Sequence, residues 1–90
     1  MKQAHIIVEG KVHGVFFRES TKNKANQLGL NGYVKNLPDG NVEIVAEGNK
    51  DNLRELIEFC RGSPGASKVS EVKFVFQDTQ NIFNGFVIKY

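Results

Sequence analysis

The sequence predicts an α+β fold, a two-layer ferredoxin-like sandwich in which two helices cover one face of a mostly antiparallel sheet. The predicted order of elements is strand, helix, strand, strand, helix, strand, followed by a short last strand, which is typical of this arrangement. Each predicted helix carries a single apolar stripe. Val42, Ile44 and Ala46 alternate with Glu43 and Glu47, so that strand has one wet face. A chain of 90 residues fits one domain spanning positions 1–90.

The first half of the chain begins with a strand and a helix. Residues 4–9 are rich in β-branched side chains and end at a glycine, which predicts a strand. A glycine-containing loop follows over residues 11–17. Apolar side chains then recur at helical spacing over 18–28, and Gly29 ends this helix because glycine tolerates a positive φ.

The middle of the chain predicts a pair of strands over 32–37 and 42–47. The residues between them, Pro38, Asp39 and Gly40, each favour a turn: proline fixes φ, aspartate bonds its own backbone, and glycine permits positive φ.

The second half predicts a further helix and two strands. Residues 49–61 form the clearest helix, with Asn49 or Asp51 available to cap its start. Its apolar stripe consists of Leu53, Leu56, Ile57 and Cys60. Residues 69–77 and the closing segment "GFVIKY" predict two more strands.

The composition excludes several classes of protein. Apolar residues make up 40% and charged residues 24% of the chain, as in ordinary soluble globular proteins. The net charge of +2 argues against a strongly basic surface for nucleic acid. No apolar run approaches the ~20 residues that a membrane span needs, and the start of the chain does not resemble a signal peptide. The single cysteine fits a reducing, cytoplasmic location.

The stretch "VEGKVHGVFFR", residues 8–18, predicts an anion site. Gly10 and Gly14 permit a tight loop whose amides approach a ligand, and the helix that follows begins with unpaired N–H groups. Arg18 lies at the positive end of that helix, which is unfavourable by about 0.3–1 kcal/mol. A bound phosphate would satisfy both the arginine and the amides. From these residues alone, an ordinary turn and a surface arginine are an equal alternative.

Two motifs make the chain resemble the acylphosphatase family over nearly its whole length. The family carries Gly-x-Val-Gln-Gly-Val-x-Phe-Arg after its first strand, and this chain has "GKVHGVFFR" at residues 10–18. The second family motif matches "GYVKNLPDGNVEIVAEG", with the matching residues Gly32, Tyr33, Val34, Lys35, Asn36, Gly40, Val42 and Gly48.

The resemblance implies hydrolysis of acyl phosphates to a carboxylate and inorganic phosphate, without metal or other cofactor. Arg18 would bind the phosphoryl group, and Asn36 would orient the attacking water. The loop residues whose backbone amides would share the phosphoryl group are Val12, His13, Gly14, Val15, Phe16 and Phe17. The implied partners are a small acyl phosphate and inorganic phosphate as product or inhibitor, with no nucleic acid or membrane, and the chain is expected to be a monomer.

Three positions invite separate expectations. His13 replaces the usual Gln of the family; a tolerated loop substitution with its side chain in solvent is favoured over a pH-sensitive contact near phosphate. Tyr33 replaces a frequent Trp and is expected only to pack. The chain stops at Tyr90 directly after a strand, and one hypothesis is that its terminal carboxylate pairs with Arg18.

Other features are expected to have no chemical role. Cys60 lies on an apolar stripe and lacks the arginine six residues later that a thiol phosphatase loop needs, so it is expected to be buried. His5 has no metal-ligand spacing to other residues. The acidic residues are expected on solvated faces, namely Glu43, Glu47, Asp51, Glu55 and Glu58.

The alternative function is a non-catalytic ferredoxin-like module that binds an anion or RNA. RNA-recognition domains share this order of elements and stack bases on aromatics of their central strands. Phe74 and Phe76 have the spacing of such a platform, although core packing accounts for them more simply. A third possibility is an accessory domain of a larger enzyme.

Overall fold

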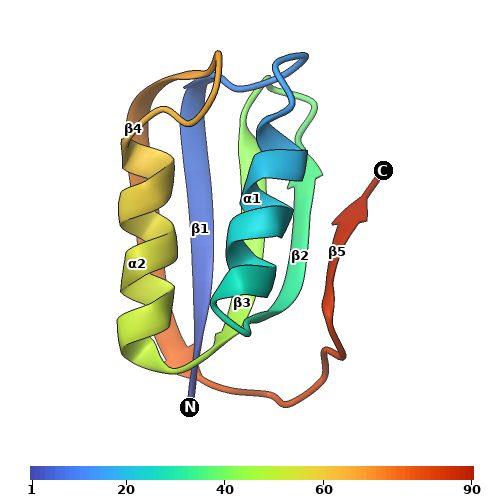
Figure 1. Cartoon of the computed structure of the whole chain (residues 1–90), viewed down its shortest axis with the longest axis vertical. Coiled ribbons are helices and arrows are strands. Elements are labelled where there is room, and N and C mark those ends of the chain that lie inside the picture. The colour runs from blue at the N-terminus through green and yellow to red at the C-terminus, as the bar shows by residue number, and fades with distance from the viewer.

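The computed structural model describes all 90 residues, and its elements follow the predicted order (Figure 1). In chain order they are β1 (Lys2–Lys11), α1 (Phe17–Gln27), β2 (Asn31–Asn36), β3 (Val42–Gly48), α2 (Lys50–Arg61), β4 (Lys68–Asp78) and β5 (Phe86–Lys89).

The strands form one sheet in the order β4-β1-β3-β2-β5, and both helices lie on the same face of it (Figure 1). β1 pairs antiparallel with β3 and β4, β2 pairs antiparallel with β3, and β2 pairs parallel with β5. The predicted two-layer α+β sandwich is therefore confirmed, and the sheet is mostly antiparallel as expected.

β1 is longer than the predicted strand 4–9 because it pairs with a neighbour along each edge. Its pairing with β4 shifts register between Glu9 and Gly10, which marks a bulge. Gly10 has φ 132°, and a Cβ there would lie 2.2 Å from the carbonyl oxygen of Lys68. Gly10 lies within β1 rather than in the loop, and its lack of a side chain lets β4 approach β1 closely.

The core lies between the helices and the sheet. Side chains of β1 and β3 that face the helices, such as Ile6 and Ile44, are fully buried against Leu53 and Leu56 of α2. Cys60 is also fully buried, and burial raises the pKa of its thiol to about 12. The prediction that Cys60 is a structural residue is confirmed.

Residues 79–85 carry the chain from β4 across the sheet to β5 at the far edge (Figure 1). Glu47, only 4% exposed, holds this segment: its Oε2 accepts hydrogen bonds from the backbone N–H groups of Gln80, at 3.0 Å, and Asn81, at 3.1 Å. Burial by itself raises the pKa of Glu47, but hydrogen bonds, including those from Thr79 and Gln3, outweigh it and lower the pKa. The expectation that Glu47 is solvated is wrong.

A second acidic residue on the open face of the sheet is also engaged. Glu43 accepts a hydrogen bond from the Tyr33 hydroxyl at 2.9 Å, and its other oxygen lies 2.9 Å from Nε2 of His5. Burial and then Glu43 raise the pKa of Tyr33 to about 12. Glu43 is therefore half-buried and paired, and Tyr33 does more than pack.

The aromatic pair of β4 faces the helices. The ring centroid of Phe74 lies 5.6 Å from the guanidinium carbon of Arg61, and that of Phe76 lies 5.1 Å from the ammonium nitrogen of Lys50. Both cations belong to α2. These rings therefore do not form a stacking platform on the open face of the sheet.

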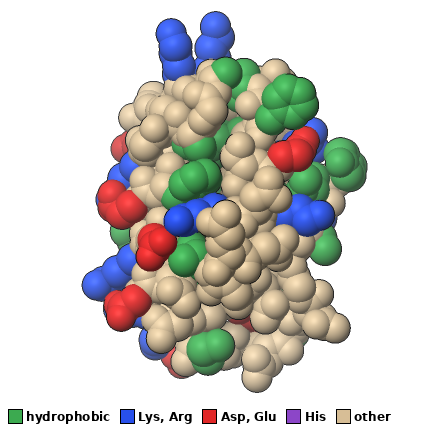
Figure 2. Space-filling model, in the orientation of Figure 1, with side chains coloured by type: hydrophobic (Ala, Val, Ile, Leu, Met, Phe, Trp, Pro, Cys, Tyr) green, Lys and Arg blue, Asp and Glu red, His purple; other side chains and the backbone are tan.

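Figure 2 shows the helix-covered face, where acidic and basic side chains are mixed along α2. The model contains no helix with both the length and the apolar character to cross a membrane.

Candidate active site

The two sequence motifs meet at the end of the sandwich where β1 and β2 finish and α1 begins (Figure 1). Residues 12–16 join β1 to α1, and Asn36 is the last residue of β2. Arg18 lies in the first turn of α1. Arg18 and Asn36 therefore both lie near strand ends on the same side of the fold.

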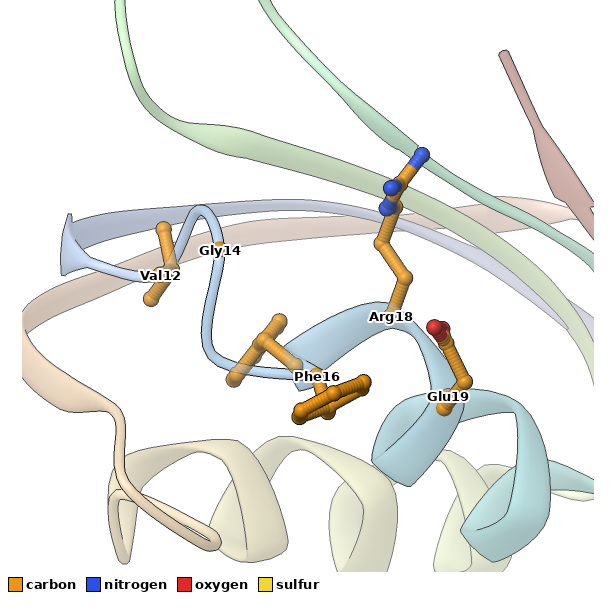
Figure 3. A pocket seen from close by; sticks show the side chains of 6 residues that line it. Val12, Gly14, Phe16, Arg18 and Glu19 are labelled. Atoms are coloured by element: carbon orange, nitrogen blue, oxygen red, sulfur yellow. The ribbon is translucent and has the colours of Figure 1, made fainter.

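A pocket of about 220 Å³ opens at this end of the fold. Figure 3 shows Val12 and Gly14 on the loop, Phe16 where the loop enters the helix, and Arg18 and Glu19 on the first turn. The complete lining is Val12, Gly14, Phe16, Phe17, Arg18 and Glu19. The volume lies below the roughly 300–1,000 Å³ of pockets for drug-sized ligands, so it suits a small group such as a phosphate with part of its substituent.

Two buried side chains fix the loop. Val12 and Phe17 are each 1% exposed and belong to the core, and Val15 packs against it partly buried. His13 and Gly14, between these anchors, face outward. The apolar residues of the motif thus hold the loop in place while its backbone borders the pocket.

The start of α1 has free hydrogen-bond donors. Its N-cap residue, Phe16, makes no side-chain cap hydrogen bond, whereas α2 begins at Asn49, whose side chain accepts from the N–H of Asp51 at 2.8 Å. The first N–H groups of a helix have no partner within it. Those of α1 therefore point toward the pocket end with the positive end of the helix dipole.

Two left-handed residues shape the loop. Gly14 has φ 69° and Phe16 has φ 59°. Glycine adopts this conformation freely, whereas a residue with a Cβ loses roughly 1–2 kcal/mol. Successive amides around such residues converge to form a concave anion site, or nest.

The Arg18 side chain extends from the first turn of α1 toward the neighbouring strands (Figure 3). Its guanidinium carbon lies 4.9 Å from the centroid of the Tyr90 ring, and Arg18 makes no ion pair in the structure. The hypothesis that the terminal carboxylate pairs with Arg18 is therefore wrong: the last residue contacts Arg18 through its ring. This cation–π contact leaves the N–H groups of the guanidinium able to bind an anion.

His13 ties the first loop to the second. Its Nε2 lies 2.8 Å from the carbonyl oxygen of Asn41, in the turn that follows Asn36. A carbonyl oxygen only accepts, so Nε2 carries the hydrogen. His13 is exposed to solvent as expected, and the hydrogen bond to Asn41 is an additional contact that the sequence did not indicate.

Asn36 points to the helix side of the sheet, because it pairs in register with Val42 and lies two residues after buried Val34. Its side-chain oxygen Oδ1 is buried and has no hydrogen-bond partner in the protein. Buried polar atoms are nearly always satisfied, and Thr21 Oγ1 is the one other buried side-chain atom without a partner.

Sequence reasoning did not anticipate that the side chains of Phe16 and Tyr90 lie at this site. The position of Phe16 between the motif residues Val15 and Phe17 was a signal, because an apolar residue at a loop tip is unusual. The contact of Tyr90 depends on β5 pairing with β2, which no local pattern specifies.

No three His, Cys, Asp or Glu side chains lie close enough together to hold a metal ion.

Comparison with known proteins decides the family. The family model described as Acylphosphatase matches residues 4–88. The chain belongs to the acylphosphatase family. An acylphosphatase of Pelotomaculum thermopropionicum is 41% identical over 88 residues, covering 98% of this chain and 96% of that protein. One from Marinobacter nauticus is 54% identical over 68 residues, covering 76% of this chain and 74% of that protein.

The fold of the acylphosphatase family is equally clear in solved structures. The crystal structure of acylphosphatase from Bacillus subtilis superposes with a TM-score of 0.95 at 37% identity, and the match covers 100% of both chains. The two sequence motifs therefore lie in a fold that matches a solved acylphosphatase over the whole length of the chain.

Proposed function

We propose that this acylphosphatase hydrolyses acyl phosphates without a metal ion, using Arg18 and the amides of residues 12–17 to hold the phosphoryl group and Asn36 to orient water. The family membership supports the reaction. The arrangement of the pocket supports the assignment of the residues.

The phosphoryl group would lie between the loop and Arg18. The uncapped start of α1 offers backbone donors and a positive dipole end, and the guanidinium can pair with two phosphoryl oxygens at once. Because these donors are fixed before the substrate arrives, they stabilise the charge that develops on the phosphoryl oxygens without reorganisation.

The observation that carries the proposal is the unpartnered Oδ1 of Asn36. Asn36 does not line the pocket itself but ends the strand beside it, and its side-chain amide would hold a water molecule by hydrogen bonds without repelling the phosphoryl group. Asn36 therefore positions the nucleophile rather than removing its proton.

The chemistry requires little else from the protein. The water oxygen forms a bond to phosphorus while the bond from phosphorus to the acyl oxygen breaks, releasing a carboxylate and inorganic phosphate. A carboxylate is a good leaving group, so the reaction needs positioning and charge stabilisation more than a general acid.

We also propose that the chain acts as a cytoplasmic monomer on a small-molecule acyl phosphate, without nucleic acid. The buried single cysteine suits a reducing compartment. The aromatic pair of β4 lies against α2, which disfavours the RNA-binding alternative.

The test is hydrolysis of acetyl phosphate and benzoyl phosphate in the presence of EDTA. The proposal predicts full activity with chelator and competitive inhibition by inorganic phosphate. Activity that disappears with EDTA and returns with a divalent cation would contradict the metal-free reaction. Absence of hydrolysis under all conditions would contradict the function itself.

A further inference from the structure

Phe16 combines two features that local physics disfavours. Its side chain is 78% exposed, although phenylalanine is a strongly apolar residue. Its backbone is left-handed, at φ 59° and ψ 24°, a conformation that suits glycine better. A glycine at this position would remove both penalties, so the ring is retained here against the preference of the local structure.

The position of the ring shows what it can contact. Phe16 lines the same pocket as Arg18 and the loop residues Val12 and Gly14 (Figure 3). A phosphoryl group bound between the loop amides and Arg18 must direct its substituent out of this small pocket. Phe16 is the exposed apolar side chain among the residues that line it.

The pocket therefore joins donors for an anion with an apolar wall. Three of its six lining residues are hydrophobic, and two of these, Val12 and Phe17, are buried beneath the loop. The third, Phe16, is free to pack against a ligand. This combination suits a molecule with a phosphoryl head and an apolar tail.

We infer that the Phe16 ring is a specificity-determining contact, which binds the acyl part of the substrate and favours acyl phosphates with an aromatic or bulky apolar acyl group. The inference rests on the proposed function and names its substrate class. Aromatic pairs prefer edge-to-face or offset-stacked contact, which an exposed ring at the rim allows.

The experiment compares kcat/KM for benzoyl phosphate with kcat/KM for acetyl phosphate, in the wild type and in Phe16→Gly. Glycine is the appropriate replacement because it adopts the left-handed conformation without strain. The wild type is expected to prefer benzoyl phosphate, and Phe16→Gly is expected to lower the ratio of the two values by about 3- to 10-fold, the worth of an aromatic contact.

Two control variants isolate the ring. Glu19→Gln removes the charge of another lining residue. The two substrates carry the same phosphoryl charge, so this variant should affect both alike and leave the ratio of their kcat/KM values unchanged. Ile82→Ala removes an exposed apolar side chain, 68% exposed, from the segment that precedes β5, and it should not change the ratio either.

A binding measurement gives a second readout. Inhibition constants for benzylphosphonate and methylphosphonate compare a substituent that contains an aromatic ring with a methyl substituent on the same phosphonate group. Phe16→Gly should weaken benzylphosphonate relative to methylphosphonate by a similar factor. If Phe16→Gly does not fold, Phe16→Leu takes its place with the same criteria, because leucine keeps apolar bulk without a ring.

The outcomes separate the two proposals. An unchanged substrate ratio and an unchanged inhibitor ratio, in a variant that still hydrolyses acyl phosphates, would overturn the role of Phe16 and leave the proposed function intact. A wild type that hydrolyses neither substrate would overturn the proposed function.

Discussion

Nε2 of His13 lies 2.8 Å from the carbonyl oxygen of Asn41, so a side chain of the first loop is tied to the turn that follows Asn36. This hydrogen bond joins the two segments that would hold the phosphoryl group and the water. Their relative position is therefore set by a contact between loops as well as by the sheet.

Removal of this contact should impair catalysis. We expect His13→Ala to lower kcat/KM for acetyl phosphate by about 3- to 10-fold, because a hydrogen bond contributes on the order of 0.5–1.5 kcal/mol. His13→Gln, which keeps a donor, should retain most of the activity. Steady-state kinetics of the two variants checks this. Equal losses in both would show that the donor is not what matters.

Glu47 should be a strong determinant of stability. Glu47→Ala removes the carboxylate that accepts from the N–H groups of Gln80 and Asn81, and it should lower the free energy of unfolding by about 1–3 kcal/mol at neutral pH. Urea unfolding measures the change. Glu55→Ala, at an exposed position of α2, is the matched control and should change stability far less.

The same residue should make stability depend on pH. The pKa of Glu47 is lowered in the folded protein from an ordinary 4.5, so its contribution is complete above that value and is lost as pH falls through the folded pKa. Below pH 4.5, the wild type should therefore lose stability more steeply than Glu47→Gln. Parallel curves for the two proteins between pH 5 and 2.5 would contradict the role of this carboxylate.

The ring of Tyr90 should help to hold the Arg18 guanidinium in position. Its centroid lies 4.9 Å from the guanidinium carbon, a contact worth about 0.5–1 kcal/mol at an exposed site. Tyr90→Ala should weaken phosphate binding by about 2- to 5-fold, whereas Tyr90→Phe should bind phosphate as the wild type does. Competitive inhibition by inorganic phosphate is the measurement. A Tyr90→Phe variant as weak as Tyr90→Ala would assign the effect to the hydroxyl instead.

Cys60 should be inert while the protein is folded. Because burial raises the pKa of its thiol to about 12, little thiolate forms at neutral pH. Iodoacetamide should modify the chain only after unfolding in urea, as mass spectrometry would show. Rapid modification of the native protein with loss of activity would contradict a structural role.

The elements of this fold were predictable because each has a strong local pattern. The single stripe of Leu53, Leu56, Ile57 and Cys60 specifies both the helix and the side that it buries. The turn at residues 38–40 and the alternation in β3 specify a pair of strands. These patterns depend on neighbours in the sequence, which is why the sequence alone contains them.

The remaining features depend on contacts between distant residues. Nothing near Glu47 in the sequence indicates that residues 79–81 will surround it. The local sequence pattern therefore does not distinguish a buried glutamate from a solvated one. The contact of Arg18 with Tyr90 needs β5 beside β2, a pairing across more than fifty residues. The loop motif predicted the position of Arg18, and only the fold shows which groups lie next to it.

The most direct measurement of the central claim is kcat/KM for benzoyl phosphate with EDTA in Arg18→Ala and Asn36→Ala. Removal of one preorganised group of this kind typically costs 10²-fold or more, and we expect each variant to lose on the order of that factor while its far-UV circular dichroism and unfolding midpoint stay near those of the wild type. A folded variant of either residue that retained activity within a few-fold of the wild type would contradict the account.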